Sequence, residues 1–193
     1  MSKDIFEIRW HGRGGQGAKT AAILFADAAL DSGLYIQAFP EYGPERMGAP
    51  VASFNRLSKS PISLHCSITN PHLVVILDPT LIGTVDVTEG LPDDGKIIVN
   101  TTLSPAEIKK SFKKPNIKVF TVDANGISKK EIGREIPNTP MLGALLKVSG
   151  LLDFEKTIKG IETKLAKKFK NKPEVITGNV NSVKRAYEEV KSE

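Results

Sequence analysis

The chain contains one cysteine, few aromatic residues and no long apolar run. Because Cys66 is the only cysteine among 193 residues, an internal disulfide and a metal or iron–sulfur site built from cysteine alone are excluded within this chain. His65 precedes Cys66, but no second pair of potential ligands follows, so we predict no metal site. No apolar stretch approaches the roughly 20 residues that a membrane-spanning helix requires.

Two further absences concern partners and location. Aromatic residues make up 6% of the chain, and neither a zinc-finger spacing nor an RNA-binding signature occurs, so we do not expect nucleic acid as a partner. The first ten residues, MSKDIFEIRW, contain no apolar core of signal-peptide length and no small-residue cleavage site. We therefore expect a cytoplasmic protein that binds no membrane.

The net charge of +5 is unevenly distributed. Residues 155–193 hold ten Lys or Arg against six Glu, so they contribute +4 of that total. A solvated helical face explains such an excess and is the interpretation we favour. An acidic partner or a polyphosphate ligand is the alternative.

Short apolar segments alternate with helical patterns along the chain. Strands are predicted over residues 4–10, 34–39, 51–57, 72–78, 96–101 and 117–124. Helices are predicted over residues 18–33, from Pro79 toward Leu91, over 104–112, and in C-terminal segments from about residue 138. This order predicts a three-layer α/β/α, Rossmann-like domain with a mostly parallel sheet, and residues 1–193 as a single domain on which the C-terminal helices pack. The 51–57 strand follows a loop too short for a helical crossover, so it is expected to be antiparallel or at an edge.

The segment HGRGGQG, residues 11–17, contains the spacing G-x-G-x-x-G. It lies between a predicted strand and a predicted helix, where glycine permits positive φ, close approach of a ligand and tight helix–strand packing. Free amides and the helix dipole at the start of the helix favour an anion, so phosphate is the expected ligand, with a charged donor added by Arg13. The predicted site residues of this glycine loop are Gly12, Arg13, Gly14, Gly15, Gln16 and Gly17.

The glycine spacing alone does not distinguish a dinucleotide from another phosphate ligand. A nicotinamide or flavin site requires an acidic residue about 20 positions beyond the loop, at the end of the second strand. Glu41 lies near that position, but within the irregular segment PEYGPERMG rather than at the end of a clean strand. A tight strand–helix turn that binds no ligand is the remaining alternative.

A second concentrated feature is the proline-bounded segment EYGPERMGAP, residues 41–50. A loop after the second strand of a parallel sheet lies at the same carboxyl edge as the glycine loop. We therefore expect the two loops to share a crevice, with ligand binding and subunit contact as near-equal alternatives for this proline loop. Its predicted site residues are Glu41, Tyr42, Glu45 and Arg46.

Two polar residues beside predicted strands are expected to be structural. His11 precedes the glycine loop, and a lone histidine is more often a structural hydrogen-bonding residue than a base or ligand. Asp78 ends an apolar strand at the carboxyl edge, where polar residues often meet ligands, and it is equally suited to cap the helix that Pro79 begins. We favour the cap.

Together, the two loops resemble the gamma subunit of the 2-oxoacid:ferredoxin oxidoreductases, most closely the pyruvate type, pyruvate synthase. The resemblance rests on HGRGGQG at 11–17 and PEYGPERMGAPV at 40–51. LDP at 77–79 and NTPMLGAL at 138–145 are similar to later stretches of the same family. The resemblance covers almost the whole chain, and the combination is more distinctive than any one motif.

The resemblance implies a multi-subunit enzyme that converts a 2-oxoacid and coenzyme A to an acyl-CoA and carbon dioxide, with electrons passed to ferredoxin. Thiamine diphosphate, magnesium and iron–sulfur clusters would lie on partner subunits, among the alpha, beta and delta chains. The gamma chain is associated with coenzyme A binding and with assembly, in an anaerobic, cytoplasmic enzyme. By this resemblance no residue of the chain is catalytic, and the isolated chain would be inactive.

The residues themselves agree with such a role. The chain lacks the cysteines for a cluster and a GDG-type thiamine motif, whereas coenzyme A carries phosphates that suit the glycine loop. Backbone amides of Gly14–Gly17 and the Arg13 side chain would hold phosphate, so that the thiol faces the thiamine-bearing subunit. Two alternatives stay open: a freestanding NAD- or FAD-binding enzyme, and an assembly protein whose glycine loop binds nothing.

Overall fold

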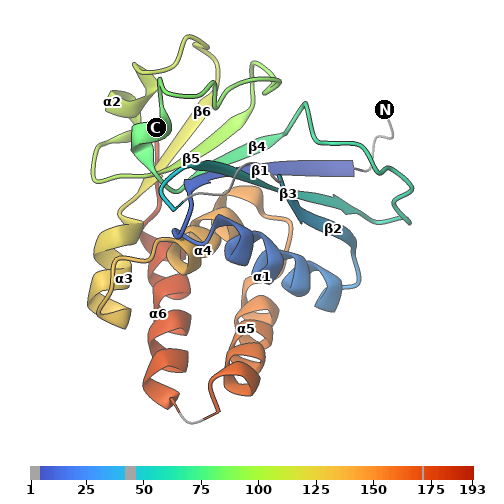
Figure 1. Ribbon diagram of the computed structural model, residues 1–193, viewed down its shortest axis with the longest axis vertical. Coiled ribbons are helices and arrows are strands. Elements are labelled where there is room, and N and C mark those ends of the chain that lie inside the picture. The colour runs from blue at the N-terminus through green and yellow to red at the C-terminus, as the bar shows by residue number, and fades with distance from the viewer. Residues whose placement is uncertain (1–4, 42–46, 171) are drawn as a thin grey trace.

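A computed structural model describes residues 5–41, 47–170 and 172–193, and Figure 1 shows their arrangement. The strands are β1 (Ile5–Arg13), β2 (Tyr35–Pro40), β3 (Pro50–Ser58), β4 (Leu73–Ile76), β5 (Lys96–Asn100), β6 (Lys118–Val122) and β7 (Lys191–Ser192). The helices are α1 (Ala18–Asp31), the short 3-10 helix η1 (Pro79–Leu81), α2 (Pro105–Lys109), α3 (Ala124–Ile132), α4 (Asn138–Ser149), α5 (Phe154–Lys168) and α6 (Pro173–Glu189).

The strands form one mixed sheet in the order β2-β3-β1-β4-β5-β6-β7. The pairs β1–β4, β4–β5 and β5–β6 are parallel, whereas β3 is antiparallel to both β1 and β2. The loop that joins β2 to β3 is too short for a helical crossover, so the chain returns antiparallel, as predicted. β7 adds an antiparallel strand beside β6, which the sequence pattern did not indicate.

β1 is longer than the strand predicted over residues 4–10 and includes Gly12 and Arg13. β3 pairs with it along its whole length, from Ile5 opposite Ser58 to Arg13 opposite Pro50. The prediction that the strand ends at residue 10 is therefore wrong, because the antiparallel partner keeps the next residues extended. The turn before α1 is confined to residues after Arg13.

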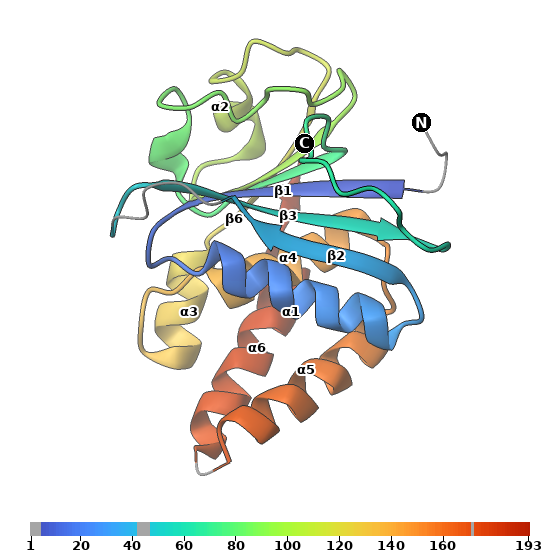
Figure 2. The ribbon, with the colours of Figure 1, turned by 45° about the vertical axis from the view of Figure 1, so that its right-hand side comes forward.

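Helices and loops cover the two faces of the sheet unequally. Figures 1 and 2 show α1, α3, α4, α5 and α6 on one side, with α2, η1 and long loops on the other. On the helical side Ile8 and Trp10 pack in one core with Phe25 of α1, and on the other side Val74 packs with Leu81 of η1. The three-layer α/β/α prediction is confirmed. Burial on both faces explains why the central strands are continuous apolar runs.

The predicted helix from Pro79 toward Leu91 is wrong beyond its first turn. η1 ends at Leu81, and Gly83 and Gly90 adopt positive φ values of 86° and 68°. These left-handed residues interrupt a right-handed helix. Leu91 is nevertheless 1% exposed. The segment therefore places its apolar residues in the core although its backbone forms turns rather than a helix.

The C-terminal helices pack beneath α1 and the sheet. α4 is central, with most of its residues buried, and Gly143 allows it to approach α6 closely, since a Cβ there would overlap the Val183 carbonyl oxygen. Asp153 caps the N-terminus of α5, and its carboxylate accepts from the Lys156 amide at 2.8 Å. No helix within the described part of the chain is both long enough and apolar enough to cross a membrane.

Candidate functional site

The glycine loop joins β1 to α1 at the carboxyl edge of the parallel strands. Gly15 and Gly17 adopt positive φ values of 97° and 83°, which residues with a side chain disfavour. At Gly17 space is also limited, because a Cβ would lie 2.6 Å from Asn138 Nδ2 at the start of α4. Gly12 lies within β1, and a Cβ there would lie 3.4 Å from the Cβ of Ala18. The glycines therefore serve both backbone conformation and tight strand–helix packing.

The first turn of α1 presents backbone amides that have no acceptor within the described part of the chain. Gly17 is the N-cap and has no side chain to accept from them, and the first turn contains no acidic residue. Among the described residues, none accepts a hydrogen bond from the amides of Gly15, Gly17 or Ala18. The helix dipole adds partial positive charge at the same point. An anion placed here would satisfy these donors.

Two other amides of the loop already have acceptors within the protein. The Gly14 amide donates to the Ala49 carbonyl oxygen at 2.9 Å, and the Gln16 amide donates to the Arg13 carbonyl oxygen at 3.0 Å. Sequence reasoning assigned phosphate contacts to the whole stretch Gly14–Gly17, but these two amides hold the loop together. With respect to the described residues, the donors left for a ligand in that stretch are the amides of its two left-handed glycines.

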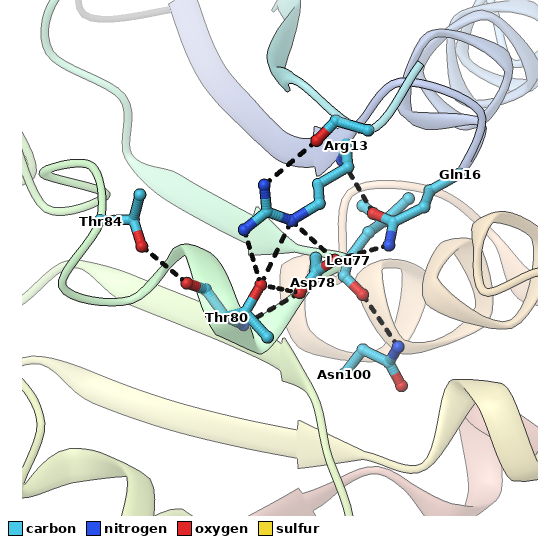
Figure 3. Close-up of polar contacts among 8 residues, drawn as sticks. Arg13, Gln16, Leu77, Asp78, Thr80, Thr84 and Asn100 are labelled. Carbon is cyan, nitrogen blue, oxygen red and sulfur yellow. Dashed lines mark hydrogen bonds and ion pairs between the residues drawn. The ribbon is translucent and has the colours of Figure 1, made fainter.

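The Arg13 side chain turns toward the end of β4 (Figure 3). Its Nη2 donates to Thr80 Oγ1 at 2.9 Å, its Nη1 donates to the Gly48 carbonyl oxygen at 3.1 Å, and its Nε lies 3.3 Å from Asp78 Oδ2. Gln16 also reaches this carboxylate, with Nε2 donating to Asp78 Oδ2 at 2.7 Å. Arg13, expected only as a charged donor to a ligand, is thus an internal bridge whose side chain keeps 29% exposure.

Asp78 combines the cap that the sequence favoured with a contact that it did not indicate. The cap is confirmed, since Asp78 Oδ1 accepts from the Thr80 amide at 2.9 Å. Partial burial raises the pKa of Asp78, but hydrogen bonds from Thr80 and Gln16 and the charge of Arg13 outweigh burial and hold its pKa below the ordinary value. The carboxylate that faces the glycine loop is therefore ionised at neutral pH.

Thr80 and Asn100 are structural members of this edge that the sequence analysis did not single out. Asn100 Nδ2 donates to the Leu77 carbonyl oxygen at 2.9 Å, and its Oδ1 accepts from the Ala124 amide at 2.9 Å. It thereby joins the ends of β4 and β5 to the start of α3. The available signal was position, since both residues follow apolar strands at the carboxyl edge.

The described part of the proline loop lies beside the glycine loop. The Gly48 amide donates to the Gly14 carbonyl oxygen at 3.1 Å. A hollow of about 470 Å³ lies there, with Glu41 and Met47 in its wall together with the glycine loop and the first turn of α1. We refer to it as the glycine-loop hollow. The predicted site residues Tyr42, Glu45 and Arg46 lie outside the described residues.

Arg9 and His11 line a second hollow, of about 580 Å³, which Glu41 also borders. Burial, reinforced by the charge of Arg9, lowers the pKa of His11 to about 4, so its imidazole is neutral at pH 7. His11 Nε2 is buried without a hydrogen-bond partner in the described part of the chain. The structural hydrogen bond expected of this histidine is absent at that nitrogen.

Comparison with known proteins assigns the chain to a family. Residues 7–189 match the family described as pyruvate ferredoxin/flavodoxin oxidoreductase. The pyruvate synthase subunit PorC of Thermotoga maritima is 48% identical over 191 residues, which are 99% of this chain and 97% of that protein. The chain belongs to this oxidoreductase family. The common gamma subunit of the pyruvate/ketoisovalerate oxidoreductases of Thermococcus kodakarensis is 49% identical over 82% of this chain and 85% of that protein.

Solved structures agree with the family assignment. The crystal structure of pyruvate oxidoreductase subunit PORC from Thermotoga maritima superposes with a TM-score of 0.86 at 45% identity, covering 99% of both chains. The gamma subunit of a keto/oxoacid ferredoxin oxidoreductase from Geobacter sulfurreducens shares the fold, with a TM-score of 0.76 at 23% identity over 96% of this chain and 95% of that one. This family member is thus a gamma-type subunit of a pyruvate or 2-oxoacid ferredoxin oxidoreductase, and the resemblance seen in its two loops is confirmed.

Proposed function

We propose that this gamma-type subunit binds the phosphate end of coenzyme A at its glycine loop and directs the thiol toward a partner subunit. The observation that carries the proposal is the set of amides at Gly15, Gly17 and Ala18, which have no acceptor among the described residues. They lie in the wall of the glycine-loop hollow. Amide donors at a helix N-terminus bind phosphate without any further special chemistry.

Charge and size support the same ligand. Lys19 and Arg13 both line the glycine-loop hollow and add positive charge to the helix dipole. A volume of about 470 Å³ is within the roughly 300–1,000 Å³ of small-molecule sites. In our proposal the hollow takes the phosphates, and the pantetheine arm extends along the subunit joint to the reacting centre.

The redox and decarboxylation chemistry belongs to partner subunits in this proposal. A four-cysteine cluster cannot form on a chain whose only cysteine is Cys66. Thiamine diphosphate and magnesium, which supply the decarboxylation chemistry when bound, are assigned with the clusters to alpha, beta and delta chains, and ferredoxin exchanges electrons with those chains. The isolated gamma chain is accordingly inactive and works in the cytoplasm as part of the complex.

Three relatives support the choice of ligand and of oxoacid. A 2-oxoglutarate:ferredoxin oxidoreductase from Magnetococcus marinus, of which 31% of the chain shares this fold with a TM-score of 0.71 at 18% identity, has been solved with coenzyme A and succinyl-CoA bound. Of the more similar relatives, one is named for pyruvate and one for both pyruvate and ketoisovalerate, and we propose pyruvate as the oxoacid.

Strand order argues against a freestanding NAD- or FAD-binding enzyme. The dinucleotide fingerprint requires an acidic residue at the end of the strand parallel and adjacent to β1. Here β3 lies between β1 and β2, so Glu41, just beyond β2, follows a strand about 10 Å from β1, or two strand spacings. That separation does not place a ribose on Glu41 in the usual way.

Calorimetric titration of the assembled complex tests the proposal. Coenzyme A should bind, dephospho-CoA more weakly, and pantetheine, which has no phosphate, more weakly still. Replacing Lys19→Gln should weaken coenzyme A binding several-fold, whereas Lys167→Gln, an exposed lysine on α5, serves as the matched control and should not. Equal affinity for pantetheine and coenzyme A, or binding of NADH or FAD instead, would overturn the proposal.

A further inference from the structure

Both carboxylate oxygens of Asp78 accept hydrogen bonds from neighbouring groups. Oδ1 accepts from the Thr80 amide at 2.9 Å and from the Thr80 hydroxyl at 2.6 Å. Oδ2 accepts from Gln16 Nε2 at 2.7 Å and lies 3.3 Å from Arg13 Nε. Oδ1 therefore contacts Thr80, just after β4, whereas Oδ2 contacts the glycine loop. A cap for η1 requires only the first pair.

Together these side chains form a closed ring of hydrogen bonds around the loop (Figure 3). The Arg13 amide donates to Gln16 Oε1 at 2.8 Å, Gln16 donates to Asp78, the Thr80 hydroxyl donates to Asp78, and Arg13 Nη2 donates back to Thr80 Oγ1. Both ends of the turn that follows β1 are therefore tied to the same carboxylate. We call the set Arg13, Gln16, Asp78 and Thr80 the Asp78 ring.

The ring also connects the glycine loop to the proline loop. Arg13 Nη1 donates to the Gly48 carbonyl oxygen at 3.1 Å, while Gly14 exchanges backbone hydrogen bonds with Gly48 and Ala49. A guanidinium has five N–H groups, and acceptors among the described residues account for one on each of Arg13 Nε, Nη1 and Nη2. The two others have no acceptor in the described ranges and can donate to a ligand.

We propose that Asp78 is a positioning residue for the anion site, acting through Arg13 and Gln16. It keeps the loop in the conformation in which the Gly15 and Gly17 amides have no acceptor among the residues that the structure describes. Without it the loop would sample other arrangements, and an incoming phosphate would have to order the loop as it bound, at a cost in affinity. This inference rests on the proposed coenzyme A site and adds to it the residue that preorganises that site.

The test is Asp78→Asn in the assembled oxidoreductase. Asparagine has the same shape, but an NH₂ group replaces one oxygen, so either Thr80 or the pair Gln16 and Arg13 loses its acceptor. The KM for coenzyme A should rise about tenfold, since a charged hydrogen-bond acceptor has been lost, with kcat at saturating coenzyme A and the KM for the oxoacid unchanged. Thr80→Val should act in the same direction by removing the bridging hydroxyl, and it keeps the experiment informative if Asp78→Asn fails to assemble.

The matched control is Asp86→Asn. Asp86 is exposed and makes the same local turn, with its Oδ1 accepting from the Thr88 amide at 3.0 Å and the Thr88 hydroxyl at 2.7 Å. Among the described residues its carboxylate makes no hydrogen bond or ion pair with Arg13, Gln16 or the proline loop. Its replacement should leave the KM for coenzyme A unchanged. Hydrogen exchange without coenzyme A supplies a readout independent of turnover: peptides covering Gly14–Ala18 should exchange faster in Asp78→Asn and at the wild-type rate in Asp86→Asn.

A double-mutant cycle with Arg13→Met shows whether Asp78 acts through Arg13. If it does, Asp78→Asn should raise the KM for coenzyme A much less in the Arg13→Met background than in the wild type. Fully additive effects, or an unchanged KM in Asp78→Asn, would overturn the inference. An unchanged KM in Arg13→Met and Lys19→Gln would instead contradict the coenzyme A site itself, so the two failures are distinguishable.

Discussion

Trp10 donates its indole N–H to Asn55 Oδ1 at 2.8 Å, and both side chains are fully buried. Asn55 Nδ2 donates in turn to the Ala22 carbonyl oxygen at 2.9 Å. A single side chain of β3 therefore joins β1 to α1, the two elements that flank the glycine loop. The antiparallel strand that interrupts the parallel sheet also fixes the helix whose N-terminus forms the site.

Replacing Asn55→Ala should lower the free energy of unfolding by about 2–3 kcal/mol, because the buried Trp10 indole loses its acceptor and a small cavity forms. Urea denaturation of the isolated chain measures the effect. Asn116→Ala, at an exposed position, is the control and should change stability by no more than about 0.5 kcal/mol. Equal effects of the two replacements would mean that the buried pair contributes nothing.

Replacement by alanine should change stability in opposite directions at two helical glycines. In Gly143→Ala the new Cβ would meet the Val183 backbone of α6, and forcing the helices apart should cost about 1–3 kcal/mol. In Gly160→Ala the nearest atom is Asp31 Oδ2 at 3.3 Å, the end of a side chain that can move. There the better helix propensity of alanine should raise stability by up to about 1 kcal/mol. Thermal unfolding of both variants distinguishes close packing of α4 on α6 from a general preference for alanine.

Two substitutions in the glycine loop distinguish the cost of a positive φ from the cost of a steric clash. Both Gly15→Ala and Gly17→Ala place a side chain at positive φ, at about 1 kcal/mol or more each. Gly17→Ala should cost more, because its Cβ would also meet Asn138, whereas nothing lies within 4 Å of a Cβ at Gly15. Adding Asn138→Ala to Gly17→Ala should recover the excess. If Asn138→Ala brings no recovery, the clash is not the cause.

His11 should make the protein less stable as the pH falls below 6.5. Burial, then Arg9, lowers its pKa in the folded chain from 6.5 to about 4. Between these pH values the unfolded chain binds a proton that the folded chain does not. The contribution of His11 to the free energy of unfolding is therefore greatest above pH 6.5 and decreases as the pH falls toward 4. The shift corresponds to a loss of up to about 3 kcal/mol.

The difference in stability between the wild type and His11→Gln isolates this contribution from the other titrating groups. The wild type should lose stability relative to the variant as the pH falls from 6.5 to 4. A difference that stays constant over that interval would show that the folded-state pKa of His11 is not lowered.

Much of the fold was accessible from local pattern. Strands near 34–39, 51–57, 72–78, 96–101 and 117–124 and the later helices were predicted because alternation and helical spacing are local properties of the chain. The extension of β1 to Arg13 and the pairing of β7 were not, because both depend on a partner strand distant in the sequence. The helix toward Leu91 was predicted from Pro79, which suits a first helical turn, but glycines at positive φ set the backbone beyond Leu81.

The candidate site was likewise predictable from the sequence only in part. The glycine spacing and its place between a strand and a helix indicated an anion site directly. The role of Arg13 as a bridge was not accessible, because its partners Thr80 and Asp78 lie more than 60 positions later in the chain.

The sequence by itself determined the alternation of strands and helices, which loop is suited to bind an anion and which family the chain resembles, because these follow from neighbouring residues and their spacing. The tertiary structure alone decided which amides remain free, which side chains hold the loop and how burial changes the pKa of His11. Those properties arise where β1, β3, β4 and α1 meet, since hydrogen bonding and desolvation depend on atoms brought together by the fold.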